Sequence, residues 1–288
     1  MRKALVISCC LIFHLRAFAQ NIYFSSEFKS KGRDIYEISI EGKNLIKLTS
    51  TLGSSHYPHH INPKLSPDGS KLVFQSDPDG HDQYTLWIMD IDGSHLKRLS
   101  KKEGLYPCWS ADGNRIYFSG RREGIWEILA IDISEGDEYI ISHNKEMGIR
   151  PGWGAVLSCH PNGQFISFTY IREKKLYLLD LHNDTIIRQG VQSAYYLHPE
   201  YSKDGKWIAV NRKIGDSYDL VLVDFEGGSE RILSTNVISY SAPAWNNSSI
   251  IFTGMIKGHH ELFRYDLELE NEKQISQLNT FTAMPTSR

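Results

Sequence analysis

The sequence predicts an all-β fold, a six-bladed β-propeller built from four-stranded blades. Three observations support this prediction. A turn sequence recurs at intervals of about 45 residues, an apolar strand follows each turn, and a later strand in each repeat ends in an aspartate. Repeats of this length cannot bury an apolar face alone, so they stack on one another, and radial stacking of four-stranded units produces a propeller.

The clearest repeat covers residues 61–100, where short β-rich runs alternate with turn residues. Residues 66–69 (Ser-Pro-Asp-Gly) supply the first turn, because Pro presets φ, Asp bonds the backbone two residues on, and Gly accepts a positive φ. Residues 71–75 and 85–89 are typical of the second and third strands, and residues 96–99 of a polar fourth strand.

Four further copies of this unit follow along the chain. Their turns begin at Ser110, His160, Ser202 and Asn246, and the aspartates that end the third strands are Asp90, Asp132, Asp180, Asp224 and Asp266. The sixth copy is divided between the chain ends: residues 22–25, 34–38 and 45–48 match its last three strands, and residues 280–286 match its first. We therefore expect the C-terminal strand to complete blade 1 and close the ring, which leaves no long exposed edge.

These repeats resemble those of a known family. A Ser/Thr-x-Asp-Gly turn, an Ile-x-Phe strand and a Tyr/Trp-x-Met-Asp-x-Asp-Gly strand are similar to the TolB-like (PD40, WD40-like) propeller repeat, over the chain from Ile22 to its C-terminus. The resemblance implies the propeller fold. It implies no single function, because the repeat occurs in scaffolds, in propellers attached to peptidases and in some polysaccharide lyases.

Residues 1–19 are predicted to be a signal peptide, and residues 20–288 the propeller. A basic pair at 2–3 precedes an apolar stretch over 4–13 and a small-x-small cleavage site at 17–19. The alternatives are an uncleaved anchor and lipoprotein processing at Cys9, and the short apolar run disfavours both. We expect a periplasmic or secreted protein of a Gram-negative bacterium, without a transmembrane segment after cleavage.

The charge balance argues against nucleic acid as a partner. The chain has 32 Lys and Arg against 34 Asp and Glu, a net charge of −2. Cleavage of the signal removes three cations and no anion, which leaves 29 cations against 34 anions, or −5. We expect a monomer that binds no nucleic acid.

In a four-stranded blade, the loop between the second and third strands lies at the same end of the ring as the connection to the next blade. We call this end the loop face and the end with the Asp-Gly turns the turn face. The predicted binding face is the loop face, with Lys31, Arg33, His59, His60, Arg121, Arg122, Trp153, Lys174, His198, Arg212 and His260. Cations pair with carboxylates and aromatic rings stack on sugars, so an envelope protein or an acidic glycan is the expected partner. The alternative is that these cations merely belong to the repeat.

No motif predicts an enzyme. The chain has no G-x-G-x-x-G or P-loop, and residues 227–231 lack the last Gly of a nucleophile elbow, so we predict no catalytic residue and no cofactor. The alternative is a metal-dependent lyase or hydrolase that acts on an acidic polysaccharide, similar to some uronate lyases. Its single divalent metal ion would be held by His56, His59, His60, His198 and His260, which lack the spacing of a recognised metal motif.

Two sets of residues at the ends of the first strands allow two interpretations each. Cys108 and Cys159 form either a disulfide between neighbouring blades or two small buried hydrophobic residues, and we favour the second because spacing cannot show that they face each other. Large residues precede the turns at Leu65, Trp109, Tyr201 and Trp245, and we expect them to pack between blades instead of stacking on a ligand. The recurring aspartates are expected to support turns.

Overall fold

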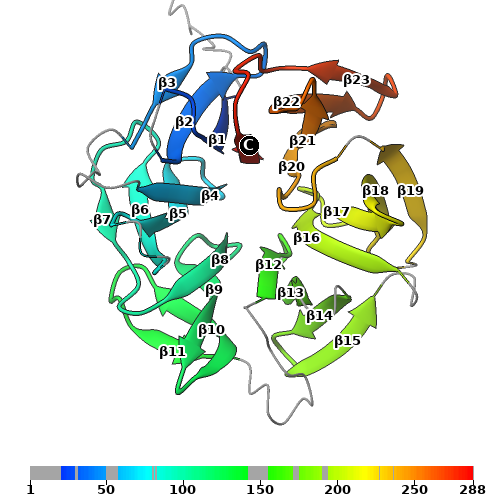
Figure 1. Cartoon of the computed structure of the whole chain (residues 1–288). Coiled ribbons are helices and arrows are strands. Elements are labelled where there is room, and N and C mark those ends of the chain that lie inside the picture. The colour runs from blue at the N-terminus through cyan, green and yellow to red at the C-terminus, as the bar shows by residue number, and fades with distance from the viewer. Residues whose placement is uncertain are drawn as a thin grey trace, which may run out of the picture.

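The computed structural model describes residues 21–29, 32–49, 58–79, 81, 83–141, 155–170, 175–189, 194–226, 228–235 and 237–287. In these residues the chain forms 24 strands in six antiparallel sheets of four. The sheets stand as blades around a central axis (Figure 1). The described segments contain no helix, hence none that is long and apolar enough to cross a membrane. The predicted six-bladed propeller is confirmed.

The strands of each blade follow one another from the axis to the rim. Blade 1 contains β24 (Thr282–Ser287), β1 (Asn21–Ser26), β2 (Asp34–Ser39) and β3 (Ile46–Lys47), and blade 2 contains β4 (His59–Leu65), β5 (Lys71–Asp77), β6 (Thr85–Asp90) and β7 (Lys97–Arg98). Blade 3 contains β8 (Gly104–Trp109), β9 (Arg115–Arg122), β10 (Ile125–Asp132) and β11 (Glu138–Ile140), and blade 4 contains β12 (Ala155–Cys159), β13 (Phe165–Tyr170), β14 (Leu176–Asp180) and β15 (Thr185–Gln189). Blade 5 contains β16 (Tyr195–Tyr201), β17 (Trp207–Ile214), β18 (Ser217–Asp224) and β19 (Glu230–Ser234), and blade 6 contains β20 (Ala244–Asn246), β21 (Ser249–Ile256), β22 (His259–Asp266) and β23 (Asn271–Gln274).

The ring closes as the sequence predicts. β24 is the innermost strand of blade 1 and pairs antiparallel with β1, with Ile22 opposite Ser287 and Ser26 opposite Thr282. The last strand of the chain therefore completes the first blade, and every blade has four strands.

The core lies between neighbouring blades. The same position of the second strand holds Phe24, Phe74, Phe118, Phe168 and Phe252, each less than 2% exposed. Residues of blade 1 pack with residues of blade 2, as Tyr23 does with Leu72 and Phe74. Burial of one such side chain stabilises the fold by about 1.5–3 kcal/mol, so each blade depends on both of its neighbours.

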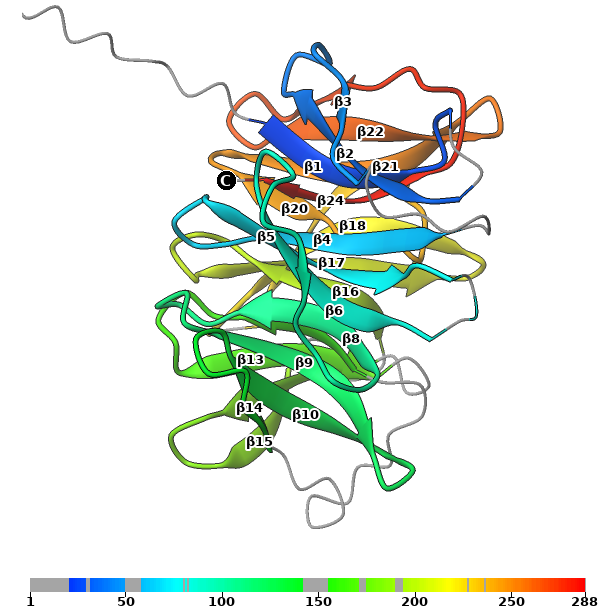
Figure 2. The ribbon, with the colours of Figure 1, turned by 90° about the vertical axis from the view of Figure 1, so that its left-hand side faces the viewer.

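The turn face consists of turns in which side chains hydrogen-bond to one another within the same turn. In the turn after β4, the Ser66 hydroxyl donates to Asp68 (2.6 Å), and the Ser110–Asp112 and Ser202–Asp204 pairs repeat this bond at 2.6 Å. Hydrogen bonds from Ser66 and Ser70 hold the pKa of the Asp68 carboxyl at about 2. Figure 2 shows the turn face on the left and the loop face on the right.

The recurring aspartates support turns, as predicted. The Asp132, Asp180, Asp224 and Asp266 carboxylates each accept a backbone N–H two residues on (2.9–3.1 Å). Asp90 instead pairs with Lys71 (2.5 Å) and His95 (2.7 Å).

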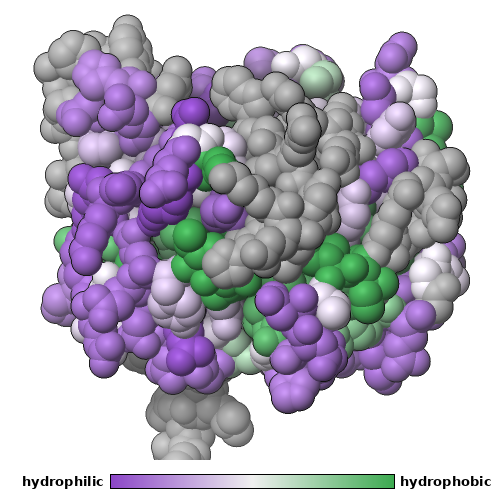
Figure 3. Space-filling model, turned by 90° about the horizontal axis from the view of Figure 1, so that it is seen from below, coloured by the Kyte–Doolittle hydropathy of each residue, from purple (hydrophilic) through white to green (hydrophobic). Residues whose placement is uncertain are grey.

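The rim of the ring consists of the outer strands. Figure 3 views the rim of blades 3 and 4, where hydrophilic side chains surround smaller hydrophobic areas. Ile140 on β11 is 38% exposed and Ile187 on β15 is 52% exposed. These outer strands are short, which limits their use as edges for another chain.

Candidate functional site

Four of the six inner strands, β4, β8, β16 and β24, share an unusual backbone feature at mid-length. Asn62, Tyr106, His198 and Met284 have positive φ values of 53°, 52°, 57° and 58°, and each precedes a proline. The strand register shifts at this point in β4, β8 and β16. Proline cannot donate to the sheet, and a bulge re-aims the neighbouring side chains. Three of these four residues, Asn62, Tyr106 and His198, line a cavity at the centre of the ring.

Side chains from five blades surround this cavity. Asn62, Tyr106, Val156, His198 and Ala242, from five blades, line a cavity of only about 10 Å³. A cavity of this size holds about one water molecule. Among the described residues, this cavity is too small for a sugar or a peptide.

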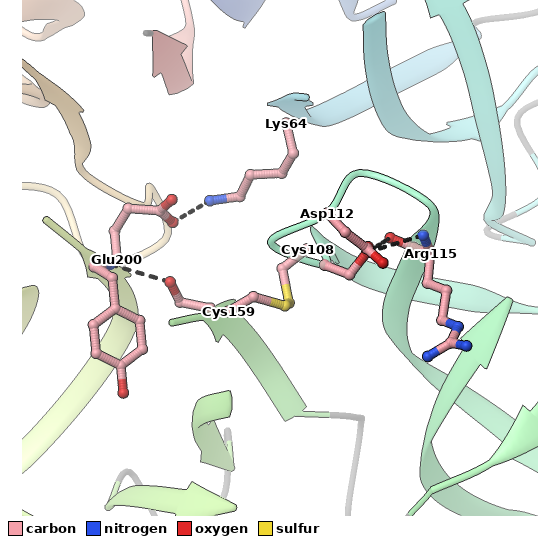
Figure 4. Close-up of a disulfide and its surroundings, with 9 residues drawn as sticks. Lys64, Cys108, Asp112, Arg115, Cys159 and Glu200 are labelled. Carbon is pink, nitrogen blue, oxygen red and sulfur yellow. Dashed lines mark hydrogen bonds and ion pairs between the residues drawn. A yellow bond between two sulfur atoms is a disulfide. The ribbon is translucent and has the colours of Figure 1, made fainter. Parts of the chain in front are cut away.

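An ion pair crosses the axis toward the turn face (Figure 4). The Lys64 ammonium on β4 donates to the Glu200 carboxylate on β16, so blades 2 and 5, on opposite sides of the ring, are joined directly. Burial, with the nearby Lys64 charge as a second cause, lowers the pKa of His198 to about 4. This imidazole is therefore neutral at pH 7.

A disulfide joins blades 3 and 4 at the turn-face end of their inner strands. Cys108 on β8 and Cys159 on β12 are bonded, with their Cα atoms 5.8 Å apart (Figure 4). The favoured prediction of two unpaired hydrophobic residues was therefore wrong. Both side chains lie at the turn-face ends of adjacent inner strands and point toward each other. The spacing in the sequence did not show that they face each other.

Tryptophans join other pairs of blades at the same height, as predicted. The Trp109 indole donates to the Lys64 carbonyl of blade 2 (2.9 Å), and the Trp245 indole donates to the Glu200 carbonyl of blade 5 (2.9 Å). Cys159 occupies the Trp position of blade 4, so the disulfide replaces an indole hydrogen bond at that seam.

An aromatic and cationic cluster lies on the loop face between blades 6 and 1. The Arg33 guanidinium lies over the Phe281 ring at 4.1 Å, and Phe281 stacks on Tyr240 with ring centres 5.7 Å apart. The Tyr240 hydroxyl and the His260 ring are hydrogen-bonded (2.6 Å), and Arg33 Nε donates to Glu27 (3.2 Å). We call these five residues the seam cluster.

The seam cluster is anchored through its backbone in two places and is accessible to solvent. Backbone bonds hold three of its five members: Arg33 N donates to the Pro58 carbonyl (2.9 Å), and Glu27 N donates to the Phe281 carbonyl (3.1 Å). Tyr240 is 37% exposed. Burial lowers the pKa of His260 below its ordinary value, an effect that Glu27 opposes. A neutral imidazole, a phenol and a guanidinium are thus held side by side at the surface.

The predicted cations of blades 3 and 5 have partners in their own blades. Arg122 at the end of β9 pairs with Glu138 on β11, and Arg212 on β17 pairs with Glu230 on β19. The Asp219 carboxylate is a second partner of Arg212, at 3.7 Å from its guanidinium. These charges are largely neutralised within the blade, whereas exposed Arg121 bonds only weakly to the Gly124 carbonyl (3.4 Å).

The structure separates the predicted histidines. His60 is buried and bonds to Ser76 (2.9 Å), His59 begins β4 beside Arg33, His198 lies at the axis, and His260 belongs to the seam cluster. Across the described parts of the chain, no three His, Cys, Asp or Glu side chains gather as metal ligands. The four described histidines of the proposed metal set therefore do not converge as ligands of one ion. Its fifth member, His56, lies outside the described residues, as do Lys31, Trp153 and Lys174 of the binding face.

Sequence reasoning missed Tyr240, Phe281 and Glu27 of the seam cluster. Tyr240 and Phe281 lie in the connections before β20 and β24, where the repeat pattern lapses. The sequence offered one signal for Tyr240 and Phe281: both are aromatic residues in connections that the repeat places on the loop face.

Comparisons with known proteins agree with the fold. The family model described as PD40, TolB beta propeller domain, matches residues 26–169 and 107–286. A Bacillus subtilis protein named uncharacterized peptidase YuxL is 26% identical over 178 residues, which cover 59% of this chain and 25% of that protein. This chain thus spans about a quarter of the length of that relative.

Solved structures share the fold at low identity. TolB from Acinetobacter baumannii superposes with a TM-score of 0.80 at 17% identity, over 94% of this chain and 67% of that one. An oligogalacturonate lyase in complex with manganese superposes with a TM-score of 0.55 at 13% identity, over 89% of this chain and 74% of that one. At such identities the likeness concerns the fold alone. The match of the family model to both halves of the ring shows that this chain belongs to the PD40 family, the TolB beta propeller domain.

Proposed function

We propose that the protein is an exported, non-catalytic binding or scaffolding module that contacts a protein partner or an acidic ligand of the cell envelope through its loop face. The observation that carries this proposal is the seam cluster, in which a backbone bond anchors Arg33, the Arg33 guanidinium lies over Phe281, and the Tyr240 hydroxyl bonds to the His260 ring. A prearranged cation beside aromatic rings is a recognition surface, because little side-chain freedom is lost on binding.

Export to the periplasm, or secretion, rests on the predicted signal peptide of residues 1–19, which precede the described residues. The disulfide between Cys108 and Cys159 supports this proposal, because disulfides persist in oxidising compartments.

A lyase would need a pocket for a sugar and a group that removes a proton. The centre of the ring instead holds the ion pair of Lys64 and Glu200 and a cavity of about 10 Å³. The described histidines do not converge on one point. No observation in the described residues favours the metal-dependent lyase or hydrolase over a binding module.

Photo-crosslinking in the cell envelope tests the proposal. A benzophenone amino acid would replace Lys29, Arg121 or Lys257 on the loop face, and Asn114 or Lys203 on the turn face as matched controls. We expect one recurring adduct from loop-face positions and none from turn-face positions. Adducts from the turn face alone, or turnover of polygalacturonate by the purified protein with added divalent metal, would overturn the proposal.

A further inference from the structure

The loop face of blades 5 and 6 exposes large apolar side chains. Tyr195, Ile214, Tyr240, Met255 and Ile256 are between 37% and 49% exposed. Ile214 and the pair Met255 and Ile256 lie at the tips of hairpins whose strands pair up to their two-residue turns. The other exposed large hydrophobic residues of the described chain lie on outer strands or in a turn between them.

Cations accompany these apolar groups. Three cations lie over aromatic rings: Lys29 over Phe28 (5.2 Å), Arg33 over Phe281 (4.1 Å) and Lys175 over Tyr195 (4.5 Å). All three pairs are on the loop face, in or beside blades 5, 6 and 1. Lys213 and Lys257 add two charges at the hairpins, and neither takes part in an ion pair among the described residues.

Acidic groups are fewer in this sector. Glu27 pairs with Arg33, and Asp216 forms the turn of the blade 5 hairpin. Glu261 is buried and accepts bonds from the Leu278 and Asn279 backbone (3.1 and 2.6 Å), so it is not presented to a partner. Five cations against two exposed carboxylates make this sector positive on a chain of net charge −2.

We infer that the loop face of blades 5, 6 and 1 docks an acidic segment of a partner protein that also carries aromatic or aliphatic side chains. This inference rests on the proposed function and names its partner by chemistry. Carboxylates would pair with Arg33, Lys213 and Lys257, while apolar side chains would cover Met255, Ile256 and Ile214.

The mixture of charge and apolar surface favours this partner over the other candidates. A polyanionic glycan would satisfy the cations and leave the apolar side chains in water. A purely apolar surface would bury the cations without partners, which costs free energy. Only a segment with both kinds of side chain satisfies both parts of the sector. Because the cations already lie on aromatic rings, they are partly ordered before binding.

Binding of synthetic polymers to the purified full chain tests the inference. The probes are a random copolymer of glutamate and tyrosine, polyglutamate, and polygalacturonate, each compared at one ionic strength. We expect the copolymer to bind about tenfold more tightly than either of the other two, because only it covers the apolar groups. Equal or tighter binding of polygalacturonate would overturn the inference in favour of a glycan. Equal binding of polyglutamate would also overturn it, because the apolar side chains would then contribute nothing to binding.

Variants locate the site and separate this inference from the proposed function. The double variant K213E/K257E should weaken copolymer binding about tenfold, and M255S/I256S should weaken copolymer binding about tenfold while leaving polyglutamate binding unchanged. K203E on the turn face is the matched charge control. If R121E on blade 3 abolishes binding and K213E/K257E does not, the docking site is not on blades 5, 6 and 1. The inference then fails, while the proposed binding through the loop face stands. If no loop-face variant affects binding, both proposals fail.

Discussion

The turn face and the loop face are built from the same six repeats, yet their side chains differ. Those of the turn face bond to one another, whereas several large ones of the loop face are exposed to solvent. On the turn face, Ser66 and Asp68 bond to each other, and the equivalent turns repeat the bond. At that end of the inner strands lie the disulfide of Cys108 and Cys159 and the ion pair of Lys64 and Glu200. On the loop face, Tyr240 and Met255 are exposed, at 37% and 49%.

The difference shows where the fold keeps its stability. The disulfide, the ion pair across the axis and the tryptophan hydrogen bonds join blades at the turn-face end of the inner strands, whereas the loop face also exposes large side chains to solvent. Loops positioned by a rigid scaffold are where binding residues commonly lie. We therefore expect stability to respond to the turn-face end and binding to respond to the loop face.

The largest effect should follow from opening the ring, on which both faces depend. Deletion of residues 279–288 removes β24 and leaves β1 without its inner neighbour. Thr282 and Ala283 are fully buried, so the deletion also uncovers the seam with blade 6. We expect no cooperative unfolding transition by circular dichroism.

A rearranged chain is the control for that deletion. Ser287 lies opposite Ile22, so a short turn can join the end of β24 to the start of β1. Moving residues 279–287 in front of Asn21 should restore the transition. A deletion variant that melts like the intact chain would show that closure by β24 is dispensable.

The disulfide should give the next largest effect and sharpen the comparison. It joins two cysteines 51 residues apart, and a loop of this size corresponds to a stabilisation of about 4 kcal/mol in the chain-entropy model. The variant C108S/C159S should lose about that much in urea unfolding. Reductant should lower the stability of the natural chain and leave the variant unchanged, and copolymer binding should persist below the transition. Insensitivity of the natural chain to reductant would contradict the stabilising role of this disulfide.

The sequence predicted the features that recur in every repeat and missed those that occur once. The turns, the aspartate supports, the tryptophan positions and the closing strand recur at a constant interval, so their alignment alone predicted them. The pair of Lys64 and Glu200 joins residues 136 positions apart in blades whose relation appears only when the ring is built. Tyr240 and Phe281 lie in connections of irregular length, where the repeat gives no register. The partners of Arg122 and Arg212 were readable, because Glu138 and Glu230 begin the fourth strands of the same blades.

Acid should destabilise the packed centre through His198, between the two faces. Its folded pKa is about 4 against an ordinary 6.5, so below pH 6.5 the unfolded chain binds a proton that the folded chain refuses. Stability is therefore fully present above pH 6.5 and falls as the pH drops toward 4, by up to about 3 kcal/mol. The charge that acts on this imidazole is that of Lys64, which is itself paired with Glu200.

The variant H198N isolates this contribution. Asparagine tolerates the positive φ of 57° and does not titrate. Between pH 7 and 4.5, the natural chain should lose more unfolding free energy than H198N, because only the natural chain has the imidazole. Equal losses in the two chains would show that other groups account for the acid sensitivity.

The smallest predicted effect compares one residue from each face. In D68A, the Ser66 hydroxyl and the Ser70 N–H lose their carboxylate acceptor, and since the turn is exposed the cost should be about 1 kcal/mol. In K213A, no ion pair among the described residues is broken, so the change should stay within about 0.5 kcal/mol. Binding should show the reverse order: K213A weakens copolymer binding and D68A leaves it unchanged. If K213A costs as much stability as D68A, the loop face also holds the fold together, and the division of labour between the two faces does not exist.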